Sequence, residues 1–143
     1  TPSERRGRGV IQPALWESEP GCVHMLMRSS EGRIYRSDSR DFGATWRPAY
    51  ATGLPNNNSG VSLTRVPDGR LYLVYNPVGV NRGPRTPLKL ACSRDGGASW
   101  EDRFTLEDGP GEYSYPDIVF ASGALLVTYT YQRKSIAFWE FPI

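Results

Sequence analysis

Short runs of apolar residues, separated by turn-forming residues, extend along most of the chain, and helical periodicity is nearly absent. Runs of this length that are bounded by Gly, Pro, Asn and Asp are typical of β-strands. The clearest runs are Val23–Met27, Leu71–Tyr75, Leu88–Cys92, Leu125–Tyr131 and Ile136–Phe141. The pattern therefore predicts an all-β chain.

One turn sequence occurs twice. Residues 39–46 read SRDFGATW and residues 93–100 read SRDGGASW, so both fit S-x-D-x-G-x-[S/T]-W at a distance of 54 residues. In such a turn the Asp accepts hydrogen bonds from backbone amides, the Gly adopts a positive φ, and the Trp covers the turn. Two copies that both follow an expected strand indicate a structural repeat.

Each repeat unit is predicted to contain consecutive antiparallel strands. A first strand is expected at Val10–Glu17, Gly60–Val66 and Ser114–Ala121, and a Gly turn, a second strand, a loop and a third strand follow each. Units of about 40–55 residues with four strands are typical of propeller blades. We therefore expect residues 1–143 to form a partial propeller of about three four-stranded antiparallel blades, at about 10–55, 56–110 and 111–143.

Three blades fall short of the four to eight that usually close a propeller. We expect either part of a larger ring, such as half of a six-bladed one, or a homo-oligomer in which other copies complete the ring. Residues 1–9 are polar and are expected to form a tail or a connection between blades. They are too polar for the apolar core of a signal peptide, so they do not decide the compartment. Of the open locations, we favour a secreted or periplasmic one over a cytoplasmic one.

Composition narrows the classes of function. Lys and Arg total 17 against 15 for Asp and Glu, and no apolar stretch approaches the length of a membrane span, which excludes a strongly basic nucleic-acid binder and a membrane-spanning chain. Cys22 and Cys92 are expected to be two buried thiols rather than a disulfide. We expect no metal, because a single histidine without clustered cysteines makes a poor site, and no cofactor.

The repeated turn is the Asp-box of the BNR repeat, and the chain resembles the sialidase (neuraminidase) superfamily of β-propellers. The resemblance covers most of Val10–Ile143 and is strongest with the C-terminal half of bacterial sialidase-like domains. It implies a protein that acts on acidic glycans, either an exo-α-sialidase or a related glycosidase. Two alternatives stay open: a non-catalytic Asp-box propeller that binds glycan or protein, and a polysaccharide lyase that acts on uronic acids.

The same resemblance implies site residues. By position, Arg28 and Arg85 resemble two of the three arginines that grip the carboxylate of sialic acid. Tyr113 resembles the tyrosine nucleophile, with Tyr115 as a competing alignment, and a neutral tyrosine avoids repulsion by the substrate carboxylate. Gln12 stands where the family has the glutamate that deprotonates the tyrosine, and an amide cannot act as that base.

The first arginine of the grip and the acid/base aspartate belong to the N-terminal half of the family, so this chain alone is not expected to hold a complete site. Asn58 and Ser59 lie in the polar run 56–60 and are expected either in an ordinary turn or on a sugar-binding rim. Arg133 is a further candidate for substrate binding, with a surface position as its alternative. His24 is predicted to be packed between strands rather than catalytic, and the Ser, His and Asp order of a serine hydrolase is not visible.

Overall fold

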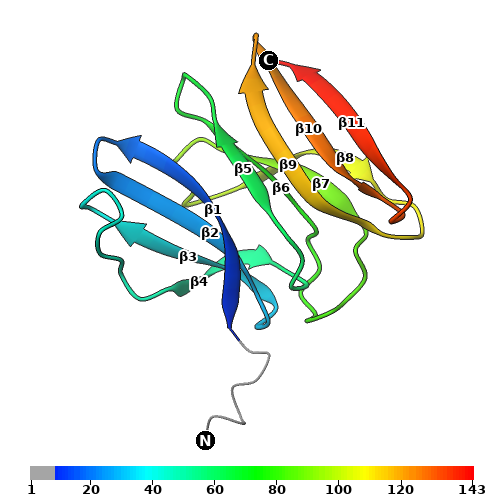
Figure 1. Cartoon of the computed structure of the whole chain (residues 1–143), viewed down its shortest axis with the longest axis horizontal. Helices are drawn as coiled ribbons and strands as arrows, with labels where there is room; N and C mark the ends of the chain where they lie inside the picture. Colours follow the sequence, from blue (N-terminus) through cyan, green and yellow to red (C-terminus); the bar gives the residue numbers. More distant parts are fainter. Residues whose placement is uncertain (1–8) are drawn as a thin grey trace, which may run out of the picture.

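A computed structural model describes residues 9–143, and these residues form three antiparallel β-sheets without a helix (Figure 1). The first sheet contains β1 (Val10–Glu19), β2 (Cys22–Ser29), β3 (Arg33–Ser39) and β4 (Tyr50–Pro55). The second contains β5 (Ser62–Arg65), β6 (Leu71–Tyr75), β7 (Leu88–Ser93) and β8 (Glu101–Glu107). The third has three strands, β9 (Tyr113–Ala121), β10 (Ala124–Tyr131) and β11 (Ser135–Pro142).

Strands that are consecutive in the chain are neighbours in every sheet. The predicted all-β class and its antiparallel sheets are confirmed. The tail expected over residues 1–9 lies, apart from Gly9, outside the described residues. Among residues 9–143 we find no helix that is long and apolar enough to cross a membrane.

The second sheet lies between the other two (Figure 1), and its strand β6 is therefore buried on both faces. Leu71, Leu73 and Tyr75 pack in one apolar cluster with side chains of the first sheet. Tyr72 and Val74 point to the opposite face and pack in a second cluster with side chains of the third sheet. Each such side chain contributes about 1.5–3 kcal/mol when fully buried, so the two clusters hold the three sheets together.

The first Asp-box forms the turn between β3 and β4. The Asp41 carboxylate accepts hydrogen bonds from the backbone N–H of Thr45 at 2.8 Å and from its hydroxyl at 2.5 Å. Ser39 Oγ accepts the N–H of Gly43 at 2.9 Å, and Gly43 adopts a φ of 84°. The Trp46 indole N–H donates to the Gly43 carbonyl at 2.9 Å and so closes the turn.

The second Asp-box repeats the Asp and Ser hydrogen bonds between β7 and β8, whereas its Trp100 indole N–H has no hydrogen-bond partner among residues 9–143. Asp95 accepts from the backbone N–H of Ser99 at 2.9 Å and from its hydroxyl at 2.5 Å, and Ser93 Oγ accepts the N–H of Gly97 at 2.8 Å. Donors aimed at a carboxylate stabilise its ionised form. In both boxes the hydrogen bonds from the Ser or Thr side chain and backbone lower the pKa of the aspartate to about 2.

Both cysteines are free thiols. Cys92 is buried in the cluster between the second and third sheets, as expected. The expectation of a buried thiol is wrong for Cys22, which is only partly buried because it begins β2 beside the exposed β1–β2 turn.

We expect the stabilisation by the Asp-boxes to disappear in acid. The folded-state pKa values of Asp41 and Asp95 are about 2, below the ordinary 3.8, so their contribution is complete above about pH 5 and is lost as the pH falls towards 2. Asp95→Asn should therefore lower the melting temperature clearly at pH 6 and much less at pH 2.5. Thermal melts followed by circular dichroism test this, with the exposed Asp108→Asn as the control. An Asp95→Asn effect of the same size at both pH values would contradict it.

Candidate functional site

The first strand of the first sheet, β1, and the first strand of the third sheet, β9, each carry a β-bulge close to their beginning. In β1 the pairing with β2 shifts between Ile11 and Pro13, which leaves Gln12 without a partner. In β9 the pairing with β10 shifts in the same way at Tyr115. Gln12 and Tyr115 both have a positive φ, 53° and 50°, and both precede a proline. A bulge redirects a side chain, and these two bulges bring Gln12 and Tyr115 close to Gly60.

The approach at Gly60 is close. A Cβ atom on Gly60 would lie 3.5 Å from Cδ1 of Tyr115 and 3.9 Å from Oε1 of Gln12. Gly60 belongs to the segment that leads into β5, so residues from all three sheets meet at this point. The beginnings of β1, β5 and β9 therefore form one mouth.

Arg28, near the end of β2, is held at this mouth by two side chains. Its Nε donates to Oδ1 of Asn58 at 3.0 Å, and its Nη1 donates to Oε1 of Gln12 at 2.8 Å. Gln12, which stands where the resemblance implies a base, thus acts as an acceptor that orients Arg28. The guanidinium is fixed before any ligand arrives.

Arg85 lies in the loop between β6 and β7 and stacks on Tyr115, with Cζ 5.0 Å from the ring centroid. Its side chain is 19% exposed, and Nη1 lies 3.4 Å from Oε1 of Glu112. This buried nitrogen has no hydrogen-bond partner among residues 9–143. Arg85 most strongly, and then Arg28, lower the pKa of the Tyr115 phenol against the opposing effect of burial, because a nearby cation stabilises the phenolate.

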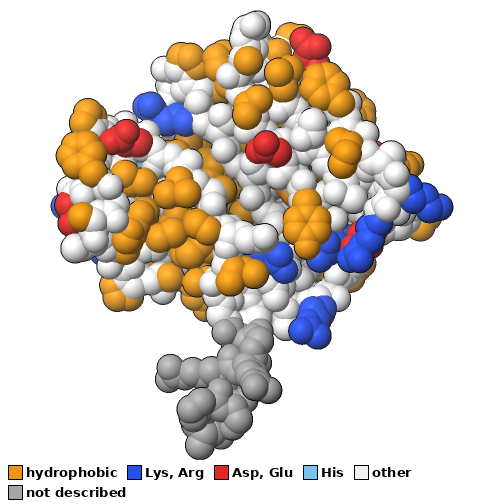
Figure 2. Space-filling model, in the orientation of Figure 1, with side chains coloured by type: hydrophobic (Ala, Val, Ile, Leu, Met, Phe, Trp, Pro, Cys, Tyr) orange, Lys and Arg blue, Asp and Glu red, His pale blue; other side chains and the backbone are white. Residues whose placement is uncertain are grey.

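A cavity of about 550 Å³ opens beside these residues. Four guanidinium groups and one carboxylate line it, those of Arg28, Arg82, Arg85, Arg133 and Glu112. Arg133 Nε lies 2.7 Å from Oε2 of Glu112, and the Arg133 side chain is 67% exposed. Figure 2 shows Lys and Arg side chains gathered at the lower right of this face, near the loops that precede β7 and β9 in Figure 1. The excess of positive charge suits an anionic ligand.

Buried asparagines hold the segments that carry the arginines. Asn56 Oδ1 accepts the backbone N–H of Ser29 at 3.2 Å, next to Arg28. Asn57 Nδ2 donates to the carbonyl of Pro84 at 2.7 Å, next to Arg85. Polar side chains that are buried and fully bonded fix loop geometry as effectively as regular structure does.

A third buried asparagine, Asn76, extends this network to the third sheet. Its Nδ2 donates to the carbonyls of Pro87 at 2.8 Å and Tyr113 at 3.1 Å. Its Oδ1 accepts the hydroxyl of Ser59 at 2.8 Å. The loop of Arg85 and the beginning of β9 are thereby tied to one side chain of the central sheet.

Two of the sequence-predicted residues do not reach the cavity. Ser59 is fully buried, and its hydroxyl is used by Asn57 and Asn76. Tyr113 is 3% exposed, and its hydroxyl lies 3.3 Å from the Pro110 carbonyl and 3.0 Å from Gln132 Nε2. Burial raises the pKa of Tyr113.

The rim position expected for Ser59 and the nucleophile position expected for Tyr113 therefore do not fit this structure. Arg28, Arg85, Asn58 and Arg133 line the cavity, while Gln12 and Tyr115 contact its arginines.

Sequence reasoning missed Glu112 and Arg82. Glu112 directly precedes Tyr113 in the stretch that carries the resemblance, and its position there is the signal that points to it. Arg82 lies in the loop of Arg85 and carries no comparable signal. Within residues 9–143, no group of three or more His, Cys, Asp and Glu side chains is arranged to hold a metal ion.

The three sheets and the cavity define a glycosidase-like β-propeller architecture. A family model described as "BNR repeat-like domain" matches residues 2–127, and the chain belongs to this family. The predicted membership of the sialidase-like BNR propeller superfamily is thereby confirmed. A search of curated proteins finds no match.

Solved structures with the same fold include several glycosidases. The NanB sialidase of Streptococcus pneumoniae matches with a TM-score of 0.67 and 19% identity over 92% of this chain and 23% of its own. The intramolecular trans-sialidase of Ruminococcus gnavus matches with a TM-score of 0.69 and 17% identity over 96% of this chain and 33% of its own. The α-L-arabinofuranosidase of Fusarium graminearum matches with a TM-score of 0.69 and 16% identity over 92% of this chain and 45% of its own. At such identities the similarity shows the fold, and this chain spans less than half the length of each of these proteins.

We expect the Tyr115 phenol to titrate below the ordinary pH range of tyrosine because Arg85 and Arg28 stabilise its phenolate. Ultraviolet absorbance at the phenolate band, recorded as the difference between the wild type and Tyr115→Phe, isolates this residue. Arg85→Ala should shift its titration to higher pH, whereas the exposed Arg94→Ala should not. An unchanged titration in Arg85→Ala would contradict the assigned contact.

We expect Asn76→Ala to destabilise the fold strongly, because the carbonyls of Pro87 and Tyr113 lose their hydrogen-bond donor. Each buried polar group left unpaired costs about 1–3 kcal/mol. Chemical denaturation measures the free energy of unfolding, and the exposed Asn81→Ala serves as the control. Equal stability of the two variants would show that the asparagine network does not support the loops.

Proposed function

We propose that this protein acts on glycosides of acidic sugars, with Arg28 and Arg85 binding the sugar carboxylate and Tyr115 acting at the anomeric carbon. The observation that carries the proposal is the convergence of two guanidinium groups, from different sheets, on the phenol of one tyrosine. The sialidase and arabinofuranosidase folds among the similar structures support a glycosidase.

A sugar carboxylate is the ligand class that the cavity suits best. Guanidinium groups donate paired, charged hydrogen bonds to a carboxylate and stay protonated at every physiological pH. Arg28 is pre-oriented by Gln12 and Asn58, and Arg85 is held between the Tyr115 ring and the Glu112 carboxylate. Orientation before binding lowers the entropic cost of holding the ligand.

Tyr115 has the properties of a nucleophile for such a sugar. In the proposed step its phenolate oxygen bonds to the anomeric carbon, the glycosidic C–O bond breaks, and the leaving alcohol takes up a proton. The phenolate is favoured by Arg85 and Arg28, so the lack of a base at Gln12 is partly offset. We propose that the acid for the leaving group comes from further blades, supplied by an N-terminal half or by a second copy.

Exposed apolar residues support a neighbour at the first sheet. Ile11 and Leu15 of β1 are 55% and 52% exposed, although both belong to a strand whose opposite face carries the buried Trp16. Figure 2 shows hydrophobic side chains over this part of the molecule, at the left. A further blade packed there would bury them as β6 is buried.

A non-catalytic glycan-binding propeller is the second candidate, and Gln12 favours it. The Gln12 amide cannot accept the phenol proton, and the nearest cavity carboxylate, Glu112, is occupied by Arg133 and Arg85. The two candidates share the carboxylate grip and differ in turnover.

Binding of acidic sugars tests the shared part of both candidates. Calorimetric titration of the protein with N-acetylneuraminic acid, glucuronic acid and galactose should show binding of the acids only. Arg85→Ala should weaken it about 10–100-fold, as expected for loss of charged hydrogen bonds worth about 1.5–3 kcal/mol, and Arg94→Ala should not. Equal binding by the two variants would overturn the carboxylate grip.

Turnover separates the two candidates. With the proposed further blades present, a fluorogenic sialoside should be cleaved by the wild type and not by Tyr115→Phe, which keeps the ring against Arg85 but lacks the nucleophilic oxygen. Binding without turnover in that complete assembly would establish the non-catalytic propeller. Cleavage of a fluorogenic arabinofuranoside but of no acidic glycoside would refute the assigned substrate class.

A further inference from the structure

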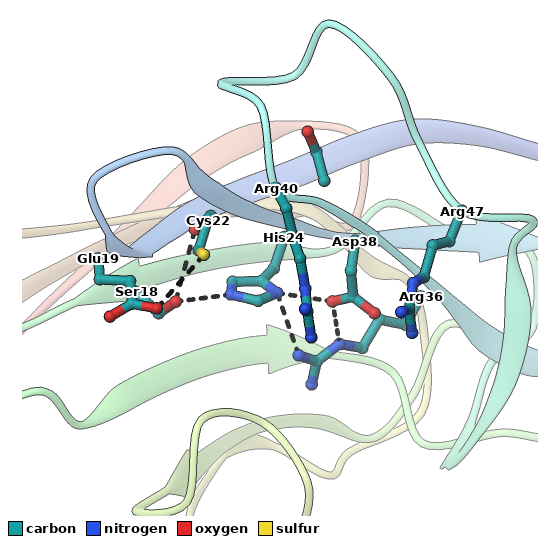
Figure 3. Close-up of a pocket in the computed structure, with 9 residues that line it drawn as sticks. Ser18, Glu19, Cys22, His24, Arg36, Asp38, Arg40 and Arg47 are labelled. Carbon is teal, nitrogen blue, oxygen red and sulfur yellow. Dashed lines mark hydrogen bonds and ion pairs between the residues drawn. The ribbon is translucent and has the colours of Figure 1, made fainter.

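A second cavity, of about 440 Å³, lies at the other end of the first sheet (Figure 3). It is bordered by the β1–β2 turn and by the first Asp-box, and Ser18, His24 and Asp38 are among its lining residues. Ser18 lies six positions after Gln12 along strand β1, which corresponds to about 20 Å at the usual rise of a strand. This cavity is therefore distinct from the arginine-lined cavity at the other end, which Arg28 and Arg85 border.

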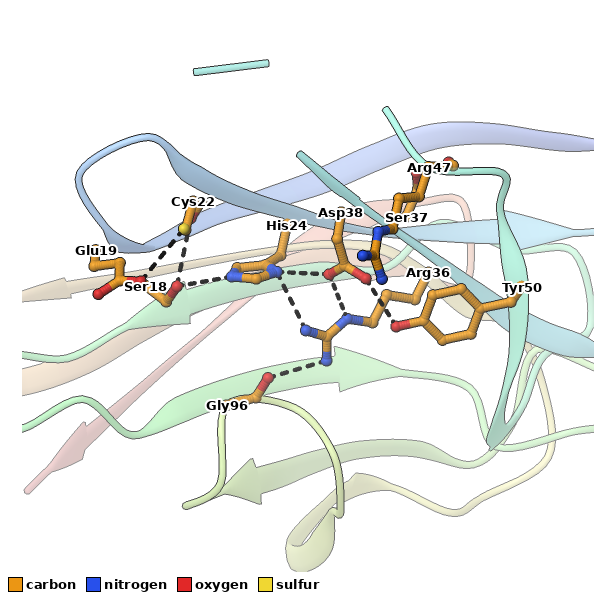
Figure 4. Close-up of polar contacts among 10 residues, drawn as sticks. All are labelled: Ser18, Glu19, Cys22, His24, Arg36, Ser37, Asp38, Arg47, Tyr50 and Gly96. Carbon is orange, nitrogen blue, oxygen red and sulfur yellow. Dashed lines mark hydrogen bonds and ion pairs between the residues drawn. The ribbon is translucent and has the colours of Figure 1, made fainter. Parts of the chain in front are cut away.

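Ser18, His24 and Asp38 form a continuous hydrogen-bonded chain across three adjacent strands (Figure 4). Ser18 Oγ lies 2.8 Å from Nε2 of His24, and Nδ1 of His24 lies 2.6 Å from Oδ1 of Asp38. His24 and Asp38 are directly opposite each other in the pairing of β2 with β3. A hydroxyl and a carboxylate on the two different nitrogens of one imidazole is the arrangement that activates a serine.

The distances define the direction of the hydrogen bonds. A separation of 2.6 Å between a ring nitrogen and a carboxylate oxygen requires a proton between them, and we assign it to Nδ1; in the neutral imidazole Nε2 is then the acceptor. Ser18 then donates to Nε2, since its alternative acceptor, the carbonyl of Cys22, lies at 3.5 Å. Arg36 Nη2, which is 3.2 Å from Nδ1, lies beside this bond without replacing it.

Surrounding groups hold the imidazole and the carboxylate in place. The Trp16 ring stacks on His24 with centroids 4.8 Å apart. Asp38 accepts a hydrogen bond from Arg36 Nε at 2.8 Å and one from the Tyr50 hydroxyl at 2.9 Å. Burial opposes the ionisation of Asp38, but its hydrogen bonds with His24, Arg36 and Tyr50 together lower its pKa, so the carboxylate stays charged at neutral pH.

Besides Ser18, the cavity is lined by the Ser39 hydroxyl, which is buried and donates to Oδ1 of Asp41 at 2.7 Å, and by the Cys22 thiol. The Cys22 Sγ lies 3.4 Å from Oε1 of Glu19, and this hydrogen bond raises the pKa of Cys22. The thiol is therefore kept protonated and poorly reactive. Ser18, which is exposed, is the group that both meets solvent and contacts a base.

We propose that Ser18 is the nucleophile of a second site, which transfers acyl groups from carboxylic esters that carry a negative charge. Ser18 Oγ bonds to the acyl carbon while its proton passes to Nε2 of His24. The ester C–O bond then breaks, and the leaving alcohol takes that proton. Water hydrolyses the acyl-serine by the same path, which regenerates Ser18 and releases the acid.

The charge of the substrate is inferred from Arg40 and Arg47. Both line the cavity and are exposed, and no ion pair of either is found among residues 9–143. Their guanidinium groups supply positive charge for the anionic part of the ester and for the oxyanion that forms at the acyl carbon. Arg36, in contrast, is already paired with Asp38.

Covalent labelling tests the nucleophile directly. The protein is treated with a fluorophosphonate reagent, and labelled serines are located by peptide mass spectrometry. We expect Ser18 to be labelled at least about 100-fold faster than the exposed Ser122, because a positioned base accelerates attack by 10²–10⁴. Ser18→Ala should remove the label, and Ser122→Ala should leave it unchanged.

His24→Gln and Asp38→Asn should each slow labelling of Ser18, and thermal melts will show that the variants are folded. Labelling of Ser18 and Ser122 at equal rates in the wild type would overturn the proposal and make the chain of hydrogen bonds a purely structural contact. If His24→Gln fails to fold, Ser18→Ala serves in its place. An unchanged total labelling rate in folded Ser18→Ala, with the label at other serines, would equally overturn the proposal.

Ester hydrolysis tests the substrate class. The probes are 4-nitrophenyl acetate and the mono-4-nitrophenyl ester of glutaric acid, which carries a free carboxylate. We expect faster turnover of the charged ester, loss of both activities in Ser18→Ala, and, in the Arg40→Ala, Arg47→Ala double variant, a larger fall in turnover for the charged ester than for 4-nitrophenyl acetate. Preference for the neutral ester would overturn the assignment of a negatively charged substrate.

Discussion

Hydrogen bonds from three buried asparagines, Asn56, Asn57 and Asn76, connect the loops that surround the arginine-lined cavity. They reach the backbone beside Arg28 and Arg85 and the backbone of Tyr113, and so they join segments of all three sheets. A buried amide that lost these partners would be costly, which makes the loop positions close to unique. The geometry of the cavity therefore depends on buried polar side chains as well as on the arginines that line it.

The apolar packing of β6 provides the frame on which this network rests. Because the side chains of β6 alternate between two clusters, one short strand sets the spacing of both neighbouring sheets. The same sheets have two ends, and each end carries a cavity. At one end four arginines face a single carboxylate, so positive charge is in excess. At the other, Arg36 is neutralised by Asp38 and helps to hold His24 and Ser18 in a hydrogen-bonded chain.

Local sequence determined the strands, the repeat and the Asp-box turns, because each depends on residues that are close in the chain. The two boxes form the predicted hydrogen bonds from backbone amides to Asp41 and Asp95, and the strand Leu71–Tyr75 has the predicted bounds. The family resemblance added the two arginines, Arg28 and Arg85, that now line one cavity. The position of Glu112 directly before Tyr113 was an unused signal for that residue, whereas Arg82 has no distinctive spacing that could have identified it.

The direction of individual side chains was decided only by the tertiary structure. Tyr113 and Tyr115 are two residues apart and would share a face in a regular strand, but the bulge at Tyr115 turns it out while Tyr113 stays buried. Ser59 is likewise buried, because its hydroxyl donates to Oδ1 of Asn76 and does not face the cavity. The register of β1, β2 and β3 brings together the side chains of Ser18, His24 and Asp38. Register is a pairing between strands, and no single stretch of sequence encodes it.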